Sequence, residues 1–246
     1  MKRIGVISDP HGNLFALDAV LAELEREELD GLVCLGDVAA GPQPAETLAR
    51  IRDLGCPIVQ GNWDVWLSDG FPPGSDETGR KLVEIGESWA AQMSPEDVEL
   101  MRGFSPTLEL DLDGGETAFC FHGSPSSNME GIYAVTPEET LAAMLVDAPG
   151  QVVLCGHTHV QMLRRHEETV IVNPGSVGLP FVDWAPHTVR VAPWAEYGIL
   201  ACDDGALGVD LRRTRYDVDA FLDLALTSGM PHARWWVDSW QRDLVG

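Results

Sequence analysis

The sequence predicts one α/β domain that contains two β-sheets. In the first half, short apolar runs alternate with amphipathic segments, so strands and helices are expected to alternate. In the second half, paired apolar runs are joined by Gly- and Asp-containing turns, which is typical of β-hairpins. The chain has 246 residues, of which 45% are hydrophobic and 22% charged, so it can bury a substantial core.

The first half predicts a parallel sheet with helical crossovers. Strands are expected at RIGVIS, LVCLG and PIVQ, and helices at 14–28, 44–54, 80–92 and from Pro95 onward, with a loop at 69–79. A capping box formed by Ser94 and Asp97 is expected to start the helix at Pro95. The strand-helix-strand rhythm implies right-handed crossovers.

The second half predicts three hairpins and three helices. The hairpins are expected at 107–123, 160–175 and 197–213, and a further strand at QVVLCG. A helix capped by Thr136 is expected to run to about Asp147, another starts at about Asp217, and a Trp-rich helix ends the chain. No linker or repeat is visible, so residues 1–246 are expected to form a single domain, with the helices of 217–246 packed on it or appended to it.

The charge balance excludes some partners. With 39 acidic and 16 basic residues the formal net charge is −23, which disfavours binding to nucleic acid or to anionic membranes. No targeting signal and no membrane-spanning run is visible, so a cytoplasmic protein is expected. The five cysteines contain no CxxC pair and are expected to be buried thiols.

Polar residues of metal-ligand type recur at one kind of place, directly after an apolar run. They are Asp9 and His11, Asp37, Asn62 and Asp64, His122, and His157 and His159. In open α/β sheets the carboxyl ends of the strands form the ligand crevice, so these residues are expected to converge. Imidazoles, carboxylates and a carboxamide suit a site for two transition-metal ions, and such a pair can polarise a phosphoryl group.

The motifs Asp9-x-His11, Gly36-Asp37, Gly61-Asn62-x-Asp64, His122 and Gly156-His157-x-His159 resemble the signature of calcineurin-like metallophosphoesterases. The sequence NPGSVG at 173–178 resembles the bacterial phosphodiesterase branch of that superfamily. The resemblance implies a four-layer α/β/β/α sandwich of two mixed sheets flanked by helices.

The resemblance also implies roles for individual residues. Asp9, His11 and His159 would hold one divalent ion, and Asn62, His122 and His157 the other, with Asp37 bridging the two. A metal-bridging hydroxide would attack phosphorus in line. Catalytic roles are assigned to Asp37, Asn62, Asp64 and His122. Manganese is the favoured ion, and iron, nickel, cobalt and zinc remain alternatives.

One position departs from the family pattern. Many members have a histidine after the asparagine, which is thought to protonate the leaving group, and here the residue is Trp63, which cannot supply a proton at neutral pH. Asp64 therefore lacks the partner that it would orient. The change favours leaving groups that need little protonation, such as activated aryl esters or nucleotide phosphoanhydrides.

Contacts to substrate are predicted at three positions. Trp63 belongs to an aromatic group that would either stack on a nucleobase or pack in the core, and Ser176 and His187 are weaker candidates, His187 also as a substitute acid. The terminal Trp235, Trp236 and Trp240 are expected to pack on the sandwich or to form a homodimer contact.

The sequence thus favours a metal-dependent hydrolase of phosphodiesters or nucleotide anhydrides, acting on a small phosphorylated substrate. A phosphomonoesterase or protein phosphatase with the same site is the first alternative. A non-catalytic metal-binding scaffold of the same fold is the second.

Overall fold

The strands form two mixed sheets in the computed structural model, which describes residues 1–146, 148–182 and 189–244. The four-stranded sheet has the order β2-β1-β8-β9 and the five-stranded sheet the order β3-β4-β5-β7-β6. The strands are β1 Lys2–Ile7, β2 Gly31–Cys34, β3 Thr107–Asp111, β4 Thr117–Phe121, β5 Val152–Leu154, β6 Met162–His166, β7 Thr169–Asn173, β8 Ala195–Asp203 and β9 Ala206–Thr214. The two predicted sheets are therefore confirmed.

The strands that precede the candidate ligands run parallel to one another within each sheet. β1 pairs with β2 in parallel and its last residue, Ile7, is level with Cys34. β4 and β5 are also parallel, with Cys120 level with Leu154. Because paired parallel strands end at the same level, the segments after β1 and β2 begin side by side, as do those after β4 and β5.

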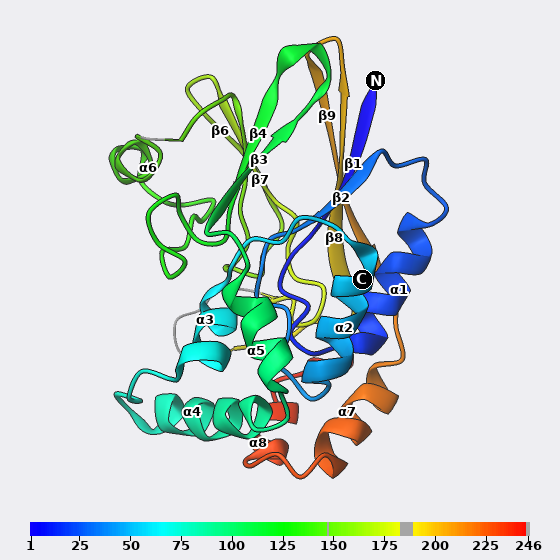
Figure 1. The fold of residues 1–246 in the computed structure, drawn as a ribbon, viewed down its shortest axis with the longest axis vertical. Helices are drawn as coiled ribbons and strands as arrows, with labels where there is room; N and C mark the ends of the chain where they lie inside the picture. The colour runs from blue at the N-terminus through cyan, green and yellow to red at the C-terminus, as the bar shows by residue number, and fades with distance from the viewer. Residues whose placement is uncertain (147, 183–188, 245–246) are drawn as a thin grey trace.

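Helices cover the outer faces of both sheets, which gives four layers (Figure 1). α6 lies beside the five-stranded sheet, α1 and α2 lie beside the four-stranded sheet, and α3, α4, α5, α7 and α8 gather at the lower end of the view. The helices are α1 Leu14–Leu24, α2 Pro44–Leu54, α3 Asn62–Asp69, α4 Glu77–Ala90, α5 Pro95–Arg102, α6 Glu138–Met144, α7 Val218–Thr227 and α8 Ala233–Val237.

Three apolar clusters hold these layers together. The cluster between the sheets joins β1 and β2 to β4, β5 and β7 through side chains such as Val6, Leu35 and Leu154. The largest cluster packs the four-stranded sheet against the helices, and the third packs Leu141 of α6 on the outer face of the five-stranded sheet. β5 is buried along its whole length, as expected of a strand covered on both faces.

Several local predictions need correction. The segment 57–60 is no strand and forms only isolated bridges, Cys34 with Ile58 and Val59 with Ser105. α3 was not predicted. α1 ends at Leu24 instead of residue 28.

The caps of two helices can also be compared with the prediction. α6 begins after Pro137 with no side-chain cap, because the Thr136 hydroxyl accepts from the Tyr133 N–H instead. The predicted end of this helix at Asp147 lies outside the described residues. The capping box of Ser94 and Asp97 at the start of α5 is confirmed.

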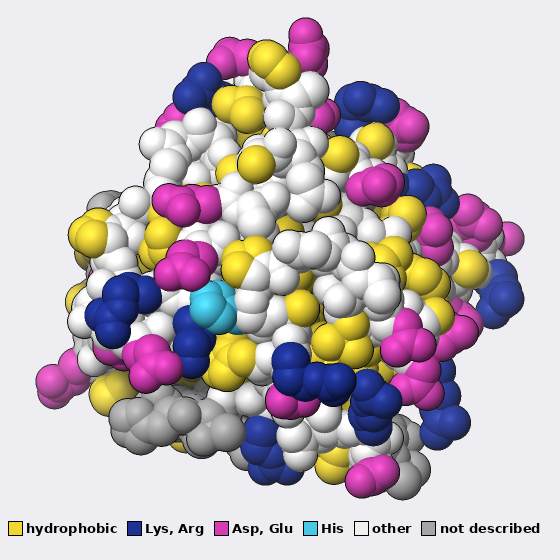
Figure 2. Space-filling view, turned by 90° about the horizontal axis from the view of Figure 1, so that it is seen from below, with side chains coloured by type: hydrophobic (Ala, Val, Ile, Leu, Met, Phe, Trp, Pro, Cys, Tyr) yellow, Lys and Arg dark blue, Asp and Glu magenta, His cyan; other side chains and the backbone are white. Residues whose placement is uncertain are grey.

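The C-terminal helices are part of the largest core. Trp236 and Trp240 are buried, lie 4.5 Å apart between ring centroids, and both pack on Phe221 of α7. Figure 2 shows this end of the molecule, where acidic, basic and hydrophobic side chains are intermingled. Within the described ranges, no helix has the length and hydrophobicity needed to cross a bilayer.

Replacing Leu154 with alanine tests the inter-sheet core. Leu154 is fully buried between the sheets, so Leu154→Ala is expected to lower the free energy of unfolding by about 2–5 kcal/mol. Leu163→Ala is the matched control, because Leu163 is 56% exposed on the edge strand β6 and its loss is expected to change stability by less than about 0.5 kcal/mol. Urea unfolding measures both, and equal losses would contradict the inter-sheet core.

Candidate metal centre

The structure brings all seven predicted ligands together, six of them after the carboxyl ends of four strands and Asn62 at the start of α3. Asp9 and His11 follow β1, Asp37 follows β2, Asn62 is the first residue of α3, His122 follows β4, and His157 and His159 follow β5. All are buried except His157, which is half-buried.

The first group of ligand atoms comes from Asp9, His11, Asp37 and His159, and these atoms lie within 4.8 Å of one another. The Nε2 atoms of His11 and His159 are 3.1 Å apart, and the Nε2 atom of His159 is 3.1 Å from Asp9 Oδ1. Imidazole nitrogens and a carboxylate oxygen that converge in this way are the donors that a transition-metal ion requires.

The second group comes from Asp37, His122 and His157. The Nε2 atom of His122 lies 3.3 Å from Asp37 Oδ2 and 3.2 Å from Asn62 Oδ1. Asp37 belongs to both groups, so its carboxylate lies where a ligand shared by two ions is needed. Two groups of donor atoms that share one carboxylate could hold two metal ions.

In each of the four histidines, one ring nitrogen faces a backbone carbonyl, and we call it the outer nitrogen; the other is the inner nitrogen. Nδ1 of His11, His122 and His159 donates to the carbonyls of Ala40, Leu35 and Leu179 at 3.1, 2.7 and 2.7 Å. His157 uses Nε2 instead, and donates to the Met129 carbonyl at 3.0 Å. These bonds assign the proton to the outer nitrogen and leave the inner lone pair for a metal ion.

The two oxygens of Asp9 differ in their surroundings. Oδ2 accepts hydrogen bonds from the Ser8 hydroxyl at 2.5 Å and from the backbone N–H of His157 at 3.2 Å. Oδ1 is buried and, among the described residues, receives no hydrogen bond of good geometry, although His159 Nε2 lies 3.1 Å from it. A buried carboxylate oxygen without a donor is costly unless a cation compensates it, so this atom supports the fit of a divalent ion to the site.

Asp64 holds the backbone around Asp37 in place through three hydrogen bonds. Its Oδ2 accepts from the N–H groups of Asp37 and Gly61 at 2.8 and 2.9 Å, and its Oδ1 from that of Val38 at 2.9 Å. The Asp37 carboxylate in turn accepts a hydrogen bond from the backbone N–H of Trp63 at 2.8 Å. Gly61 is required here, because a Cβ would lie 2.1 Å from Asp37 Oδ1. In the described structure Asp64 thus positions Asp37, and the catalytic role predicted for Asp64 stays a prediction.

Five of the seven ligand residues have a left-handed backbone. Their φ angles lie between 48° and 66°, and the residues are Asp9, His11, Asp37, His157 and His159. This conformation costs about 1–3 kcal/mol for each non-glycine residue and persists only where the surroundings impose it. Here the sheet register and the hydrogen bonds of the loops impose it.

The carboxylates and imidazoles shift one another's protonation. Burial lowers the pKa of His122, but Asp37 and Asp9 outweigh it and raise this pKa to about 10. Burial, together with His159, lowers the pKa of His11 to about 4. Burial raises the pKa of Asp9, but His159, His122 and His11 outweigh it and hold that pKa well below its usual value. In the absence of metal, protons on His122 therefore balance the buried carboxylates.

Two of the three predicted substrate residues, Trp63 and Ser176, lie among the described residues, and both contact residues of the ligand set. The Trp63 ring is half-buried, 6.3 Å from the His11 ring, and packs against Trp66, Phe71 and Trp89. Ser176 is fully buried, and its hydroxyl donates to the Asp9 carbonyl, so this side chain stabilises the loop that carries Asp9. His187 lies outside the described residues.

Some residues at the site were not predicted. Phe181 stacks on His159 with ring centroids 4.3 Å apart, and Ser8 holds Asp9. Ser8 ends an apolar run directly before a ligand, which is a signal that sequence inspection can use. Phe181 offers no such signal, because it lies in a loop.

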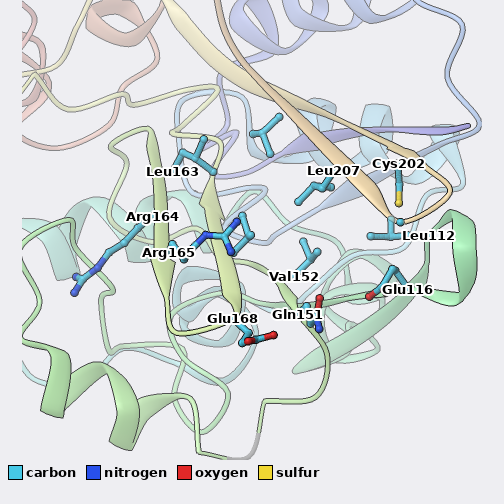
Figure 3. A pocket seen from close by; sticks show the side chains of 13 residues that line it. Leu112, Glu116, Gln151, Val152, Leu163, Arg164, Arg165, Glu168, Cys202 and Leu207 are labelled. Carbon is cyan, nitrogen blue, oxygen red and sulfur yellow. The ribbon is translucent and has the colours of Figure 1, made fainter.

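A separate cavity of about 490 Å³ opens between the sheets, away from the ligands. It lies near the free edges formed by β6 and β9, and Leu163, Val152, Leu207 and Arg165 are among its walls (Figure 3). No metal ligand lines it. The walls of the cavity carry charges of both signs, from Arg165, Glu116 and Glu168, so they favour neither anionic nor cationic ligands.

Replacing Asp64 with asparagine tests its support of Asp37. An amide nitrogen cannot accept a hydrogen bond, so Asp64→Asn is expected to lose about 1–3 kcal/mol of unfolding free energy and to weaken Mn²⁺ binding. Asp76→Asn is the matched control, because Asp76 caps α4 by accepting from the Gly79 N–H and asparagine caps equally well. Urea unfolding and calorimetric Mn²⁺ titration measure both variants. Equal stability of the two variants would contradict this role.

The pH dependence of metal binding follows from His122. The folded metal-free chain holds a proton on this group up to a pKa of about 10, whereas an unperturbed histidine loses it near about 6.5. This proton stabilises the metal-free fold below about pH 6.5, and the contribution is lost as pH rises through 10. Bound metal must displace the proton, so Mn²⁺ affinity is expected to rise from pH 6 to 8.5.

Titration calorimetry in buffers of different ionisation enthalpy measures the protons released on Mn²⁺ binding. Release of protons at pH 7 is the expected result. An affinity that does not change with pH would contradict the assignment of His122 as a ligand.

Comparison with known proteins agrees with this geometry. The chain is 29% identical over 199 residues to the uncharacterized protein MJ0912 of Methanocaldococcus jannaschii, covering 72% of this chain and 76% of that one. Its fold is similar to that of a metallophosphoesterase from Sphaerobacter thermophilus, with a TM-score of 0.75, 24% identity and coverage of 97% and 98% of the two chains. It is also similar to the hypothetical protein PH1004 from Pyrococcus horikoshii, with a TM-score of 0.77, 22% identity and coverage of 94% and 95%.

The sequence shows the family to which the chain belongs. A family model for the calcineurin-like phosphoesterase superfamily domain matches residues 1–193, which is most of the chain. The chain belongs to the calcineurin-like phosphoesterase superfamily.

Proposed function

We propose that this chain is a dinuclear metal-dependent phosphoesterase that hydrolyses phosphodiesters or nucleotide phosphoanhydrides. The observation that carries the proposal is the position of Asp37, whose carboxylate is shared by two convergent ligand groups. Asp9, His11 and His159 would hold one ion and Asn62, His122 and His157 the other, with Mn²⁺ as the favoured ion. Two divalent ions so held supply Lewis acidity and a water activated for in-line attack on phosphorus.

The chain's own residues fix the geometry of this reaction. The carbonyls that accept from the outer histidine nitrogens keep the rings oriented, and Asp64 keeps Asp37 in place. Most of the ligand side chains are buried, and in such a site the electrostatic stabilisation of the transferring phosphoryl group would be stronger than in bulk water.

The preference for diesters and anhydrides rests on Trp63. Its indole cannot donate a proton to a leaving oxygen at neutral pH and is held among Trp66, Phe71 and Trp89 beside His11. Substrates whose leaving group is stable as an anion are therefore favoured over alkyl monoesters. The aromatic rings of Trp63 and of Phe181, which stacks on His159, favour substrates that carry an aryl group or a nucleobase.

A paired assay on metal-stripped protein reloaded with Mn²⁺ tests the proposal. Cleavage of bis-p-nitrophenyl phosphate is expected to depend on the metal and to exceed cleavage of p-nitrophenyl phosphate. Asp37→Ala is expected to abolish turnover, because it removes the ligand common to both ions, and circular dichroism checks that the variant is folded.

Each other outcome of this assay has a definite meaning. Monoester preference would favour the phosphomonoesterase alternative and would make His187 the first acid to replace. Two bound ions without turnover would favour the non-catalytic scaffold. Full turnover by a folded Asp37→Ala variant would reject the two-metal mechanism.

A further inference from the structure

The turn formed by residues 173–179 fastens two of the candidate ligands. The Ser176 hydroxyl and the Gly178 N–H both donate to the Asp9 carbonyl, at 2.8 and 3.0 Å. The Leu179 carbonyl accepts from Nδ1 of His159 at 2.7 Å. Any movement of this turn is therefore transmitted to Asp9 and His159, which belong to the same ligand group.

Glu196 of β8 lies directly behind this turn. Its side chain is buried, and its own N–H donates to the Ser176 carbonyl at 3.0 Å. Oε2 lies so close to Gly175 that a Cβ there would be 2.1 Å away from it. Gly175 also has a φ of 80°, so both its backbone and the space available favour glycine. The carboxylate and the turn are thus packed against each other without room for a side chain.

The charge of Glu196 is only partly balanced. Oε1 accepts from Nε1 of Trp194 and from Nε of Arg213, each at 3.0 Å, and the Arg213 guanidinium also lies 4.7 Å above the Trp194 ring. The Arg213 side chain is 49% exposed, so solvent screens its charge. Oε2 is buried and has no donor among the described residues.

A buried carboxylate with one unsatisfied oxygen is costly unless a cation lies near it. Burial raises the pKa of Glu196 to about 7, and Trp194, Arg213 and the charge of His159 oppose this shift. His159 is a candidate ligand of the first group, so the cation nearest to Glu196 beyond the turn would be the ion of that group.

We propose that Glu196 is a positioning residue for the ion held by Asp9, His11 and His159. It braces the turn that fixes Asp9 and His159, and its negative charge behind the turn stabilises the cation. This role rests on one part of the proposed function, namely that divalent ions bind to these ligands. Outer groups that orient metal ligands contribute about 10–100-fold to metal affinity.

Titration calorimetry with Mn²⁺ at pH 8.5, where the carboxylate is ionised, tests this role. Glu196→Gln has nearly the same shape without the charge, and it is expected to weaken one of two Mn²⁺ binding steps by about 10-fold and to leave the other unchanged. Arg213→Gln removes the opposite charge and is expected to bind Mn²⁺ at least as tightly as the wild type. Glu138→Gln, which alters an exposed ion pair with Arg164, is the matched control with no expected change.

The two variants separate an electrostatic role from a purely structural one. If Glu196 served only to pack the turn, Glu196→Gln and Arg213→Gln would both lower the Tm of the metal-free protein and weaken Mn²⁺ binding together, which would overturn the proposal. Two unchanged binding steps in Glu196→Gln would also overturn it. A wild-type chain that binds no Mn²⁺ would instead contradict the proposed function itself.

Discussion

The hydrogen bonds that the Asp64 carboxylate accepts from the backbone N–H groups of Asp37, Val38 and Gly61 are the constraint on which the centre depends. One carboxylate accepts from N–H groups in the loop after β2 and directly before α3, and so joins these two loops, which the hydrogen bond from the Trp63 backbone N–H to Asp37 also connects. The bridging ligand can lie between the two ligand groups only while both loops keep this position. Burial and the charge of Asp37 raise the pKa of Asp64 to about 7, and the N–H groups of Gly61 and Val38 oppose this shift because they favour the ionised carboxylate.

The sheets supply the rest of the precision. The first ligand group combines residues after β1, β2 and β5, so it requires that the two sheets pack in one fixed relation. The inter-sheet cluster that includes Val6 and Leu154 fixes that relation, since close-packed side chains leave the sheets little freedom to slide. The backbone carbonyls that accept hydrogen bonds from the histidine rings then fix the orientation of each ring.

The sequence allowed the two sheets and the convergence of Asp9 to His159 to be predicted, because each ligand follows an apolar run that ends at the same edge. α3 was missed because its first residues are the ligand motif itself, which was interpreted as the end of an expected strand. The carbonyls of Leu35 and Leu179 could not be predicted, since any residue type offers one. Glu196 was overlooked although an acidic residue within the apolar stretch of β8 is a visible signal.

The left-handed backbone at five ligand positions has a consequence for how such a chain changes over time. At these positions glycine or asparagine relieves backbone strain, so substitutions that abolish metal binding can stabilise the fold. A lineage released from selection for chemistry would then drift toward a more stable protein with an empty site.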